Sequence, residues 1–254
     1  MPNNTSNSIE IIADDEVVKK ILADIKGGEK EDEGHVLYID FEKIVPIPEL
    51  VEGAPYSPYD ISMESRESLN GLKEVMANGL KYEDLTLHLE GPIGKIAALI
   101  LKEDKPSDEI TDEVLMDLYK STNIEVLGHY FLEKEFGVSC KYYWLLKYWG
   151  TKGGAYGSSM SDENTIAFNT AWSGCESIVI ALSKKYPEAK FRYKTCDEQT
   201  GVSCADLTYQ NGEQIEGIEY DNLSKEAFEF AFELAGGKDY FTYSEEQGTY
   251  IYYD

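Results

Sequence analysis

The sequence has few of the side chains that build metal, redox and catalytic sites. Its four cysteines, at positions 140, 175, 196 and 204, include no Cys-x-x-Cys pair, and none of its three histidines has an acidic or cysteine neighbour at a ligand spacing. Zinc sites and iron–sulfur clusters need such closely spaced ligands. Nucleophile motifs and glycine-rich phosphate loops are also missing. We therefore expect no metal, no cofactor and no catalytic residue, and the sequence favours a non-enzymatic protein over an enzyme.

Two of the cysteines leave an alternative open. Cys196 and Cys204 flank a turn that contains glycine, so they form a disulfide if the register of a hairpin makes them face each other. A cytosolic setting favours reduced, half-buried thiols instead.

Cationic side chains and long apolar runs are scarce as well. Twenty-three Lys and Arg stand against 48 Asp and Glu, which gives a formal net charge of −25. Direct nucleic-acid binding depends on cations that displace counterions from phosphates, so we expect none. No apolar run approaches the roughly 20 residues of a membrane span, and the polar start is no signal peptide. We expect a soluble, cytoplasmic protein without membrane contact, and its 254 residues have room for one large domain or two small ones.

The first 51 residues predict a strand, a helix and a second strand. Apolar alternation predicts a strand over 7–12. Helical spacing of the apolar residues from Val17 to Ile25 predicts a helix, with Asp14 or Asp15 as its cap and Gly27-Gly28 at its end. Another apolar run predicts the second strand over 36–41, before prolines that forbid both helix and central strand.

Between 52 and 135 the pattern changes to that of a mostly helical insertion. Three segments are predicted to be helices: 67–80, the segment that opens at Ser107, and 124–135. The alternating run 85–89 is typical of a strand or of a continued helix, and the apolar run 93–101 has no defined type.

The last part of the chain shows clearer signals. Residues 140–148 favour a helix over a strand, and the glycine-rich segment 150–157 predicts a loop. The remaining elements are a strand over 165–171, a helix over 176–185, strands over 190–194, 203–209 and 215–220 with an Asn-Gly turn before the last of them, a helix after Ser224, and a tyrosine-rich tail over 240–254 that forms a hairpin or stays irregular.

This order predicts an α+β fold of the ferredoxin-like (split βαβ) type, an antiparallel sheet with helices on one face. We expect this domain to comprise residues 1–51 and 136–222. The mostly helical insertion, which falls between the second and third strands, then comprises 52–135, and 223–254 form a C-terminal helix and an aromatic tail.

Three segments resemble the YubB-like family, proteins with a ferredoxin-like domain from plasmids, phages and their bacterial hosts. They are the start Met1-Pro2-Asn3 with Asn7; the segment from Ile39 to Glu49, similar to the family's F-x-K-I-I-P-x-P; and Trp149-Gly150-Thr151-Lys152 followed by Phe168-Asn169-Thr170-Ala171-Trp172-Ser173. The resemblance covers residues 1–50 and 140–210.

The chain departs from the family's pattern after each of the paired motifs. Gly153-Gly154 stand where the family has a second Trp and an Asp, and Gly174-Cys175 stand where it has prolines. A surface site built on the second Trp would be altered here. The resemblance implies a ferredoxin-like fold, a phage or mobile-element setting and the cytoplasm of a bacterial host. It implies no activity and no iron–sulfur cluster.

The paired motifs have a structural interpretation. Trp149 would close one end of the sheet, Gly150 would adopt a positive φ, and Trp172 would cap a helix that opens at Ser173.

They also have a functional interpretation, in which four side chains converge on a small recognition surface with a lysine as its cation. These are Trp149, Thr151, Lys152 and Trp172. Residues 136–194, which contain both motifs, carry eight Lys and Arg against four Asp and Glu, although the chain as a whole is strongly acidic.

The acidic excess has two interpretations as well. It forms a solvated surface that keeps the protein soluble and monomeric. Alternatively, the carboxylates imitate nucleic-acid phosphates and occupy the basic groove of a host nuclease. The candidates are Asp197, Glu198 and the acidic run 213–233, in which Glu226, Glu229 and Glu233 share one face of the last helix.

Three functional hypotheses result. The sequence favours an acidic, non-enzymatic binding protein of phage or mobile-element type, which inhibits a host defence or nucleic-acid-processing protein by occupying its basic surface. The alternative is a small-ligand-binding protein or an enzyme that uses the 149–152 loop and Trp172. The third is an accessory protein whose tail docks onto a partner or a second copy through Tyr250, Tyr252 and Tyr253. The oligomeric state is left open.

Overall fold

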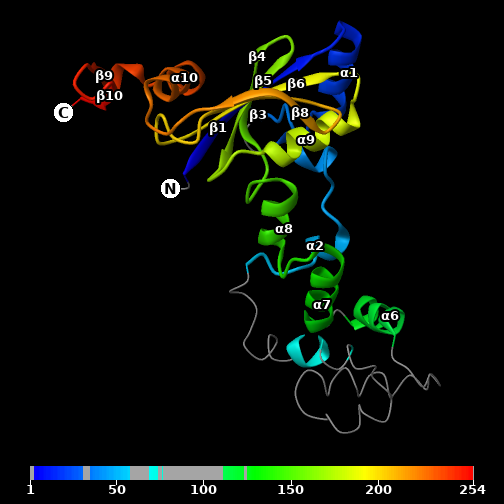
Figure 1. The fold of residues 1–254 in the computed structure, drawn as a ribbon. Coiled ribbons are helices and arrows are strands. Elements are labelled where there is room, and N and C mark those ends of the chain that lie inside the picture. Colours follow the sequence, from blue (N-terminus) through cyan, green and yellow to red (C-terminus); the bar gives the residue numbers. More distant parts are fainter. Residues whose placement is uncertain are drawn as a thin grey trace. The chain divides into compact units, whose positions relative to one another are not determined.

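The computed structural model describes residues 3–30, 35–57, 69–73, 76, 111–122 and 125–253 (Figure 1). Contacts divide the chain into two compact units. The first, which we call the sheet unit, comprises Met1–Pro46 and Leu145–Asp254; the second, the helical unit, comprises Ile47–Trp144. The boundaries expected from the sequence, 51/52 and 135/136, lie five and nine residues away from these.

The sheet unit is built around six antiparallel strands in the order β4-β5-β1-β6-β7-β8. The strands are β1 (Asn4–Ile12), β4 (Tyr156–Asp162), β5 (Thr165–Ala171), β6 (Lys190–Asp197), β7 (Ala205–Gln210) and β8 (Glu213–Glu219). Two helices belong to the same unit: α1 (Asp15–Ile25) and α9 (Glu176–Lys185). The succession β1-α1-β4-β5-α9-β6 is the split βαβ order, and β7 and β8 extend the sheet. The predicted α+β, ferredoxin-like fold is confirmed.

One face of this sheet carries the core. Every second residue of β1 from Thr5 to Ile11 is buried, and β5 shows the same alternation. In β6 the alternation holds for Phe191 and Tyr193. Helices α1 and α9 each bury an apolar stripe. The Tyr186 hydroxyl, just after α9, donates to the Asp24 carboxylate of α1 at 2.8 Å, so the two helices lie side by side. We call this side of the sheet the helical face and the other side the open face.

Helix α10 (Lys225–Ala235) covers one end of the open face. Strand alternation places Cys196 and Cys204 on this face, where they are buried with Ala227 and Phe230 of the helix. The helix begins as predicted, because the Ser224 side chain accepts a hydrogen bond from the Ala227 amide at 3.1 Å. The C-terminal extension therefore packs opposite to α1 and α9.

The tyrosine-rich tail forms the hairpin alternative, with β9 (Phe241–Ser244) and β10 (Thr249–Tyr252). The rings of Phe241 and Tyr250 pack against Phe228 of α10, with centroids 5.3 and 5.8 Å away. Tyr252 and Tyr253 are exposed, whereas Tyr250 is half-buried. Two of the three tail tyrosines that we considered for docking thus face solvent.

The predicted strand over 36–41 is wrong. Only His35–Val36 are extended there (β3), and they pair with β2 (Glu29–Lys30) outside the main sheet. The Asp40 carboxylate accepts a hydrogen bond from the Glu42 amide and caps a short 3₁₀ helix, η1 (Phe41–Lys43). Ile39 and Phe41 are buried. The apolar pattern therefore predicted the burial of these residues correctly, but it did not predict their secondary structure.

The second strand of the fold is β4, and its start at Tyr156 lies inside the segment predicted to be a loop. β4 is an edge strand that is mostly exposed, and its register with β5 is irregular. Because neither face of it is deeply buried, its sequence carries no apolar alternation. The insertion consequently lies between α1 and β4, before the second strand of the fold, and not between the second and third.

The described part of the helical unit consists of helices: α2 (Glu49–Glu52), α6 (Asp112–Thr122) and α7 (Glu125–Phe136). Leu115 and Leu118 of α6 form a core with Val126 and Leu127 of α7. The predicted helix over 140–148 is confirmed as α8 (Lys141–Tyr148), which crosses the boundary between the units. Of the predicted helix over 67–80, the described residues 69–73 and 76 are helical; the runs 85–89 and 93–101 lie outside the described residues.

Candidate functional site

The two motif segments lie against each other. The Ser173 hydroxyl donates to the Gly150 carbonyl at 2.7 Å, and the Thr151 hydroxyl donates to the Ala171 carbonyl at 3.1 Å. Gly150 has the predicted positive φ, +80°. The prediction that Trp172 caps a helix opening at Ser173 is wrong: α9 begins at Glu176 with Cys175 as its cap residue, and the Ser173 hydroxyl joins the two motifs instead.

Two of the four candidate motif residues stabilise the fold. Trp149 is buried, its indole N–H donates to the Val45 carbonyl at 3.0 Å, and its ring meets Phe41 edge-on at 5.6 Å. Thr151 is fully buried. Both side chains are used in packing.

The other two candidates reach the surface. Trp172 is 58% exposed and has a positive φ of 75°, a conformation that non-glycine residues rarely adopt. Its amide donates to the Asn3 carbonyl at 2.8 Å, which holds the backbone in place. The Lys152 ammonium lies 5.2 Å from the centroid of the Trp172 ring. The motif therefore presents one cation stacked on one strained, exposed tryptophan.

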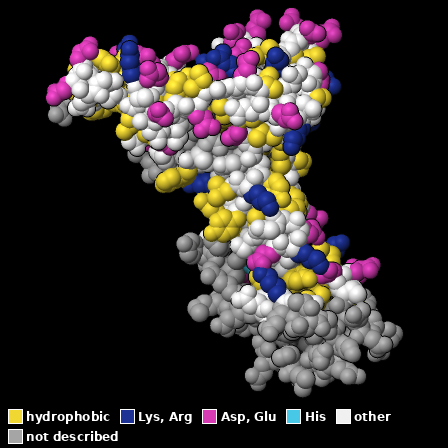
Figure 2. All heavy atoms as spheres, viewed as in Figure 1, with side chains coloured by type: hydrophobic (Ala, Val, Ile, Leu, Met, Phe, Trp, Pro, Cys, Tyr) yellow, Lys and Arg dark blue, Asp and Glu magenta, His cyan; other side chains and the backbone are white. Residues whose placement is uncertain are grey.

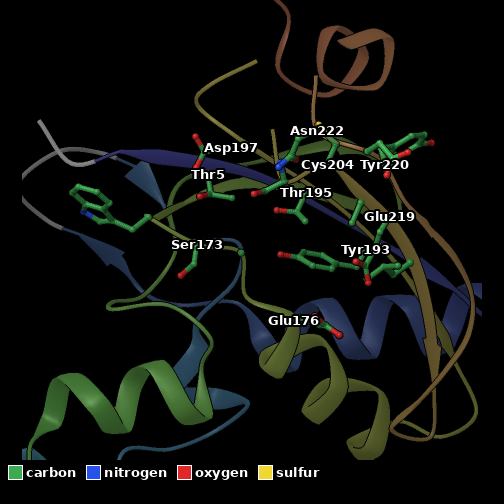
Figure 3. A pocket seen from close by; sticks show the side chains of 16 residues that line it. Thr5, Ser173, Glu176, Tyr193, Thr195, Asp197, Cys204, Glu219, Tyr220 and Asn222 are labelled. Carbon is green, nitrogen blue, oxygen red and sulfur yellow. The ribbon is translucent and has the colours of Figure 1, made fainter. Parts of the chain in front are cut away.

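Trp172 also lines a pocket of about 620 Å3, which we call the acidic pocket (Figure 3). The pocket opens on the helical face, where β6 and β8 end and α9 begins. Tyr193, Thr195 and Leu207 point to this face of the sheet and line the pocket. The sequence indicated Trp172 but gave no sign of this cavity.

A buried polar network supports the floor of the acidic pocket. The carboxamide oxygen of Asn7 accepts hydrogen bonds from the hydroxyls of Tyr193, at 2.6 Å, and Thr195, at 3.2 Å. The carboxamide nitrogen of Asn7 donates to the Thr170 hydroxyl at 2.9 Å and to the Thr5 carbonyl at 2.8 Å. Three strands that are far apart in the sequence, β1, β5 and β6, are thereby held together at the pocket.

Thr5 contributes an unsatisfied hydroxyl to the pocket. Its side chain is 3% exposed, and its Oγ1 has no hydrogen-bond partner among the described residues. Figure 3 shows it between Asp197, Ser173 and Thr195. A buried hydroxyl without a partner costs about 1–3 kcal/mol, so it is uncommon in a well-packed core.

Four carboxylates line the pocket, and no Lys or Arg does. Glu176 lies in the first turn of α9, Asp197 ends β6, Glu219 ends β8, and Asp221 follows β8. None of the four forms an ion pair within the described residues. Glu176 accepts a hydrogen bond from the buried Tyr209 hydroxyl, and burial together with this carboxylate raises the pKa of Tyr209.

The predicted pair Asp197 and Glu198 fastens the N-terminal strand. The Asn3 carboxamide donates to both Asp197 oxygens at 3.1 and 3.0 Å, and the Asn4 amide donates to Glu198 at 2.7 Å. Asp197 lines the acidic pocket; Glu198 does not.

The predicted glutamates of α10 lie apart from the acidic pocket. Glu229 pairs with Lys225 at 3.8 Å, and Glu233 pairs with Lys194 of β6 at 3.1 Å. Glu226 is exposed and has no ion pair within the part of the chain that the structure describes. Two of the three carboxylates on this helix face are therefore neutralised by the protein's own lysines.

The sequence reasoning missed Thr5 and Glu176 as pocket residues, and it missed the role of Asn7. One signal was available for Asn7: it shares a face of β1 with Ile9 and Ile11, and a polar residue in phase with a buried apolar stripe must find partners. No comparable signal joins Glu176 to Glu219.

All four cysteines are free thiols in the structure, and all are buried. Burial raises the pKa of the Cys175 thiol to about 12, so this thiol is protonated at neutral pH. The Cys196 thiol hydrogen-bonds the Cys204 thiol, which lowers the pKa of Cys204. Of the two alternatives for this pair, the structure has the reduced one.

The described residues were also compared with the requirements of a metal site and of a membrane-spanning helix. Nowhere in the described part of the chain do three or more His, Cys, Asp or Glu side chains lie close enough to hold a metal ion. Among the helices that the structure describes, none has the length and apolar character to cross a membrane.

One of the comparisons with known proteins, the match to a family model, agrees with the fold of the sheet unit. No curated protein matches the chain. The crystal structure of a protein api92 from Yersinia pseudotuberculosis aligns with a TM-score of 0.40 at 10% identity, over 87% of this chain and 99% of that one. The family of the expected resemblance, YubB-like, stays a prediction. Residues 148–236, from the end of α8 to the end of α10, match the family model described as a ferredoxin-like domain in Api92-like protein.

Proposed function

We propose that this protein is a non-enzymatic binding protein that engages a basic surface of a partner protein through carboxylates that its own fold leaves unpaired. The observation that carries the proposal is the edge strand β8. All seven of its residues are exposed, and its three glutamates, Glu213, Glu216 and Glu219, have no ion pair within the described residues. Unpaired carboxylates on an exposed edge keep their full charge available to a cationic partner.

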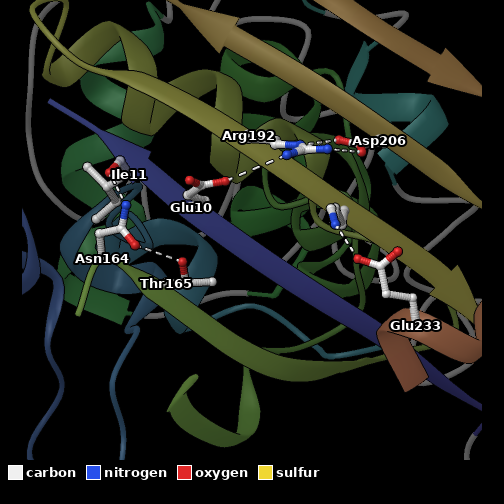
Figure 4. Close-up of polar contacts among 8 residues, drawn as sticks. Glu10, Ile11, Asn164, Thr165, Arg192, Asp206 and Glu233 are labelled. Atoms are coloured by element: carbon white, nitrogen blue, oxygen red, sulfur yellow. Dashed lines mark hydrogen bonds and ion pairs between the residues drawn. The ribbon is translucent and has the colours of Figure 1, made fainter. Parts of the chain in front are cut away.

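The cations of β6, which β7 separates from β8, behave differently. Arg192 of β6 lies between Asp206, at 2.7 Å, and Glu10, at 3.9 Å (Figure 4). Lys194, the next residue on the open face, pairs with Glu233. The ion pairs with Asp206, Glu10 and Glu233 therefore neutralise these two cations, and we propose that the sheet does not bind a phosphate backbone directly.

The surface as a whole supports this proposal. Figure 2 shows Asp and Glu side chains distributed over the sheet unit, and the chain carries a net charge of −25. A surface of this charge speeds encounter with a basic protein and repels nucleic acid. We propose that the partner is a host or phage protein whose basic groove holds nucleic acid, such as a defence nuclease, and that the two meet in the bacterial cytoplasm.

Capture from bacterial host lysate by the tagged protein tests the proposal. We expect a near-stoichiometric partner that is held at about 50 mM salt and released at about 500 mM, because screening weakens exposed charge pairs. The E213Q/E216Q double variant removes two charges from β8 and should lose the partner. The matched control, E42Q/E188Q, removes two exposed charges elsewhere and should keep it. A partner lost equally from both variants, or no salt-sensitive partner, would refute the proposal.

A second candidate function, the binding of a small ligand, is favoured by one observation: Trp172 lines a cavity of about 620 Å3. Within the 149–152 loop, Trp149 and Thr151 are committed to packing, so Lys152 and Trp172 remain for contact with a ligand. In a ligand screen read by thermal shift, K152A should lose a ligand of this surface. A ligand that stabilises wild type and K152A equally would remove Lys152 from the site.

A further inference from the structure

We infer that the acidic pocket is a binding site for an organic cation, an alkylammonium or guanidinium group. The inference rests on the proposed function, because the inferred site and the proposed partner surface both use unpaired carboxylates. It assigns a defined site to residues that lie apart from Glu213 and Glu216.

The negative charge of the pocket lining favours a positively charged ligand. Glu176, Asp197, Glu219 and Asp221 enter the pocket from three segments: the start of α9, the end of β6 and the end of β8. Within the described residues, neither an ion pair nor a lining Lys or Arg offsets their charge. Like charges that share one cavity repel each other. A bound cation relieves this repulsion, and an anion would increase it.

The spacing of the carboxylates selects an extended cation over a metal ion. No three acidic, histidine or cysteine side chains in the described ranges approach closely enough to coordinate one metal. A cavity of about 620 Å3 has the volume of a small-molecule site. An organic cation that carries its N–H donors over several ångströms can reach carboxylates that one metal ion cannot.

The Thr5 hydroxyl supplies an independent indication of a ligand. It is more than nine-tenths buried, it lines the pocket, and its Oγ1 has no hydrogen-bond partner in the part of the chain that the structure describes. A hydroxyl accepts hydrogen bonds as well as donating them, so an ammonium or guanidinium N–H that enters the pocket would satisfy it. The unsatisfied hydroxyl destabilises the free protein, and a hydrogen bond from the ligand would remove this destabilisation.

Aromatic rings complete the lining. Trp172, Tyr193 and Tyr220 all contribute to the pocket, and cations are attracted to the faces of such rings. The Trp172 ring itself takes part in such a contact, with the Lys152 ammonium 5.2 Å from its centroid.

Two kinds of ligand carry an ammonium or guanidinium group that fits this pocket. One is a free polyamine, and the other is a lysine or arginine side chain of a partner protein. Isothermal titration calorimetry at low salt separates them with two probes, spermidine and N-acetyl-arginine amide. We expect at least one probe to bind with a dissociation constant of about 0.1–1 mM. Binding of spermidine alone would identify a free polyamine; binding of the arginine derivative would identify a protein side chain. If neither binds, the inference is refuted.

Two variants locate the binding. E219Q/D221N removes two pocket carboxylates, and E213Q/E216Q removes the same charge from β8 outside the pocket. We expect about a tenfold loss of affinity in the first and less than a twofold change in the second, because only the pocket carboxylates contact the ligand. An equal loss in both would show general charge attraction and refute the site.

A third variant keeps the charge unchanged. T5V removes only the unsatisfied hydroxyl and should weaken the cation by about threefold or more while the protein stays folded. Unchanged affinity in T5V would show that Thr5 does not contact the ligand, and it would remove the independent support for the site.

The outcomes separate this inference from the proposed function. Cation binding without partner capture overturns only the proposed function. Partner capture that survives in E219Q/D221N, without any cation binding, overturns only this inference.

Discussion

Replacement of Asn7 by alanine should cost the sheet unit a large part of its stability. The Asn7 side chain is 2% exposed and makes four hydrogen bonds to three strands. In N7A the Thr170 hydroxyl keeps the Ser173 carbonyl as its acceptor, and the half-buried Thr195 can turn to solvent in the pocket. The fully buried Tyr193 hydroxyl, however, loses its acceptor.

The expected loss follows from these contacts. An unsatisfied buried donor costs about 1–3 kcal/mol, and the void left by the carboxamide adds about 1 kcal/mol, so we expect a total near 3 kcal/mol. With a urea m-value of about 2 kcal/mol/M, the midpoint of unfolding falls by about 1.5 M. Urea unfolding followed by circular dichroism measures this shift.

Two further variants control the experiment. S6A, at the neighbouring position on the open face, should change the free energy of unfolding by less than about 0.5 kcal/mol. Y193F removes the same hydrogen bond from its other end and leaves the Cys175 amide without its acceptor. The N7A/Y193F cycle should therefore show a coupling of about 1 kcal/mol or more. A loss below 1 kcal/mol in N7A, or additive effects in the cycle, would refute the network.

Three other variants and one chemical test extend these predictions. T5V keeps the shape of the side chain, removes a buried hydroxyl without a partner, and should raise the free energy of unfolding by about 1 kcal/mol; a loss of that size would mean that the hydroxyl is satisfied. W172G should be more stable than W172A by about 1 kcal/mol, since glycine adopts the positive φ freely; equal midpoints of urea unfolding would argue against backbone strain. S224A removes the cap of α10 and should lower the free energy of unfolding by about 1 kcal/mol, whereas an unchanged midpoint would show that the cap contributes little. Cys175, whose pKa is raised to about 12 by burial, should resist a thiol-specific reagent at pH 8 until the protein is unfolded; fast native-state labelling would show that it is accessible.

The fold could be predicted wherever one face of an element is deeply buried. β5 and α9 have the bounds that their apolar patterns indicated, because each packs a single stripe against the core. β4 escaped prediction since it is an exposed edge strand with glycine and serine in place of apolar alternation. Residues 36–41 misled the prediction for the opposite reason, because Ile39 and Phe41 are buried without forming a strand.

The candidate site was less accessible to sequence reasoning. The motif segments indicated Trp172 because it stands within a recognisable pattern. Glu176 and Glu219 meet at one pocket only because α9 begins where β8 ends, a consequence of strand order in the sheet. The local sequence around each of these glutamates does not indicate that the other one lies nearby.

The place of β1 has a consequence for synthesis of the chain. This first strand lies between β5 and β6, and its Asn7 contacts Tyr193, 186 positions later. At about 5–20 residues per second, β1 leaves the ribosome roughly 10–40 s before β6. Until β5 follows, both edges of β1 lack their partners, and the edge that pairs with β6 stays open for the whole interval. Closure of the sheet around β1 is thus a late, non-local event in folding, which has to wait for β5 and β6.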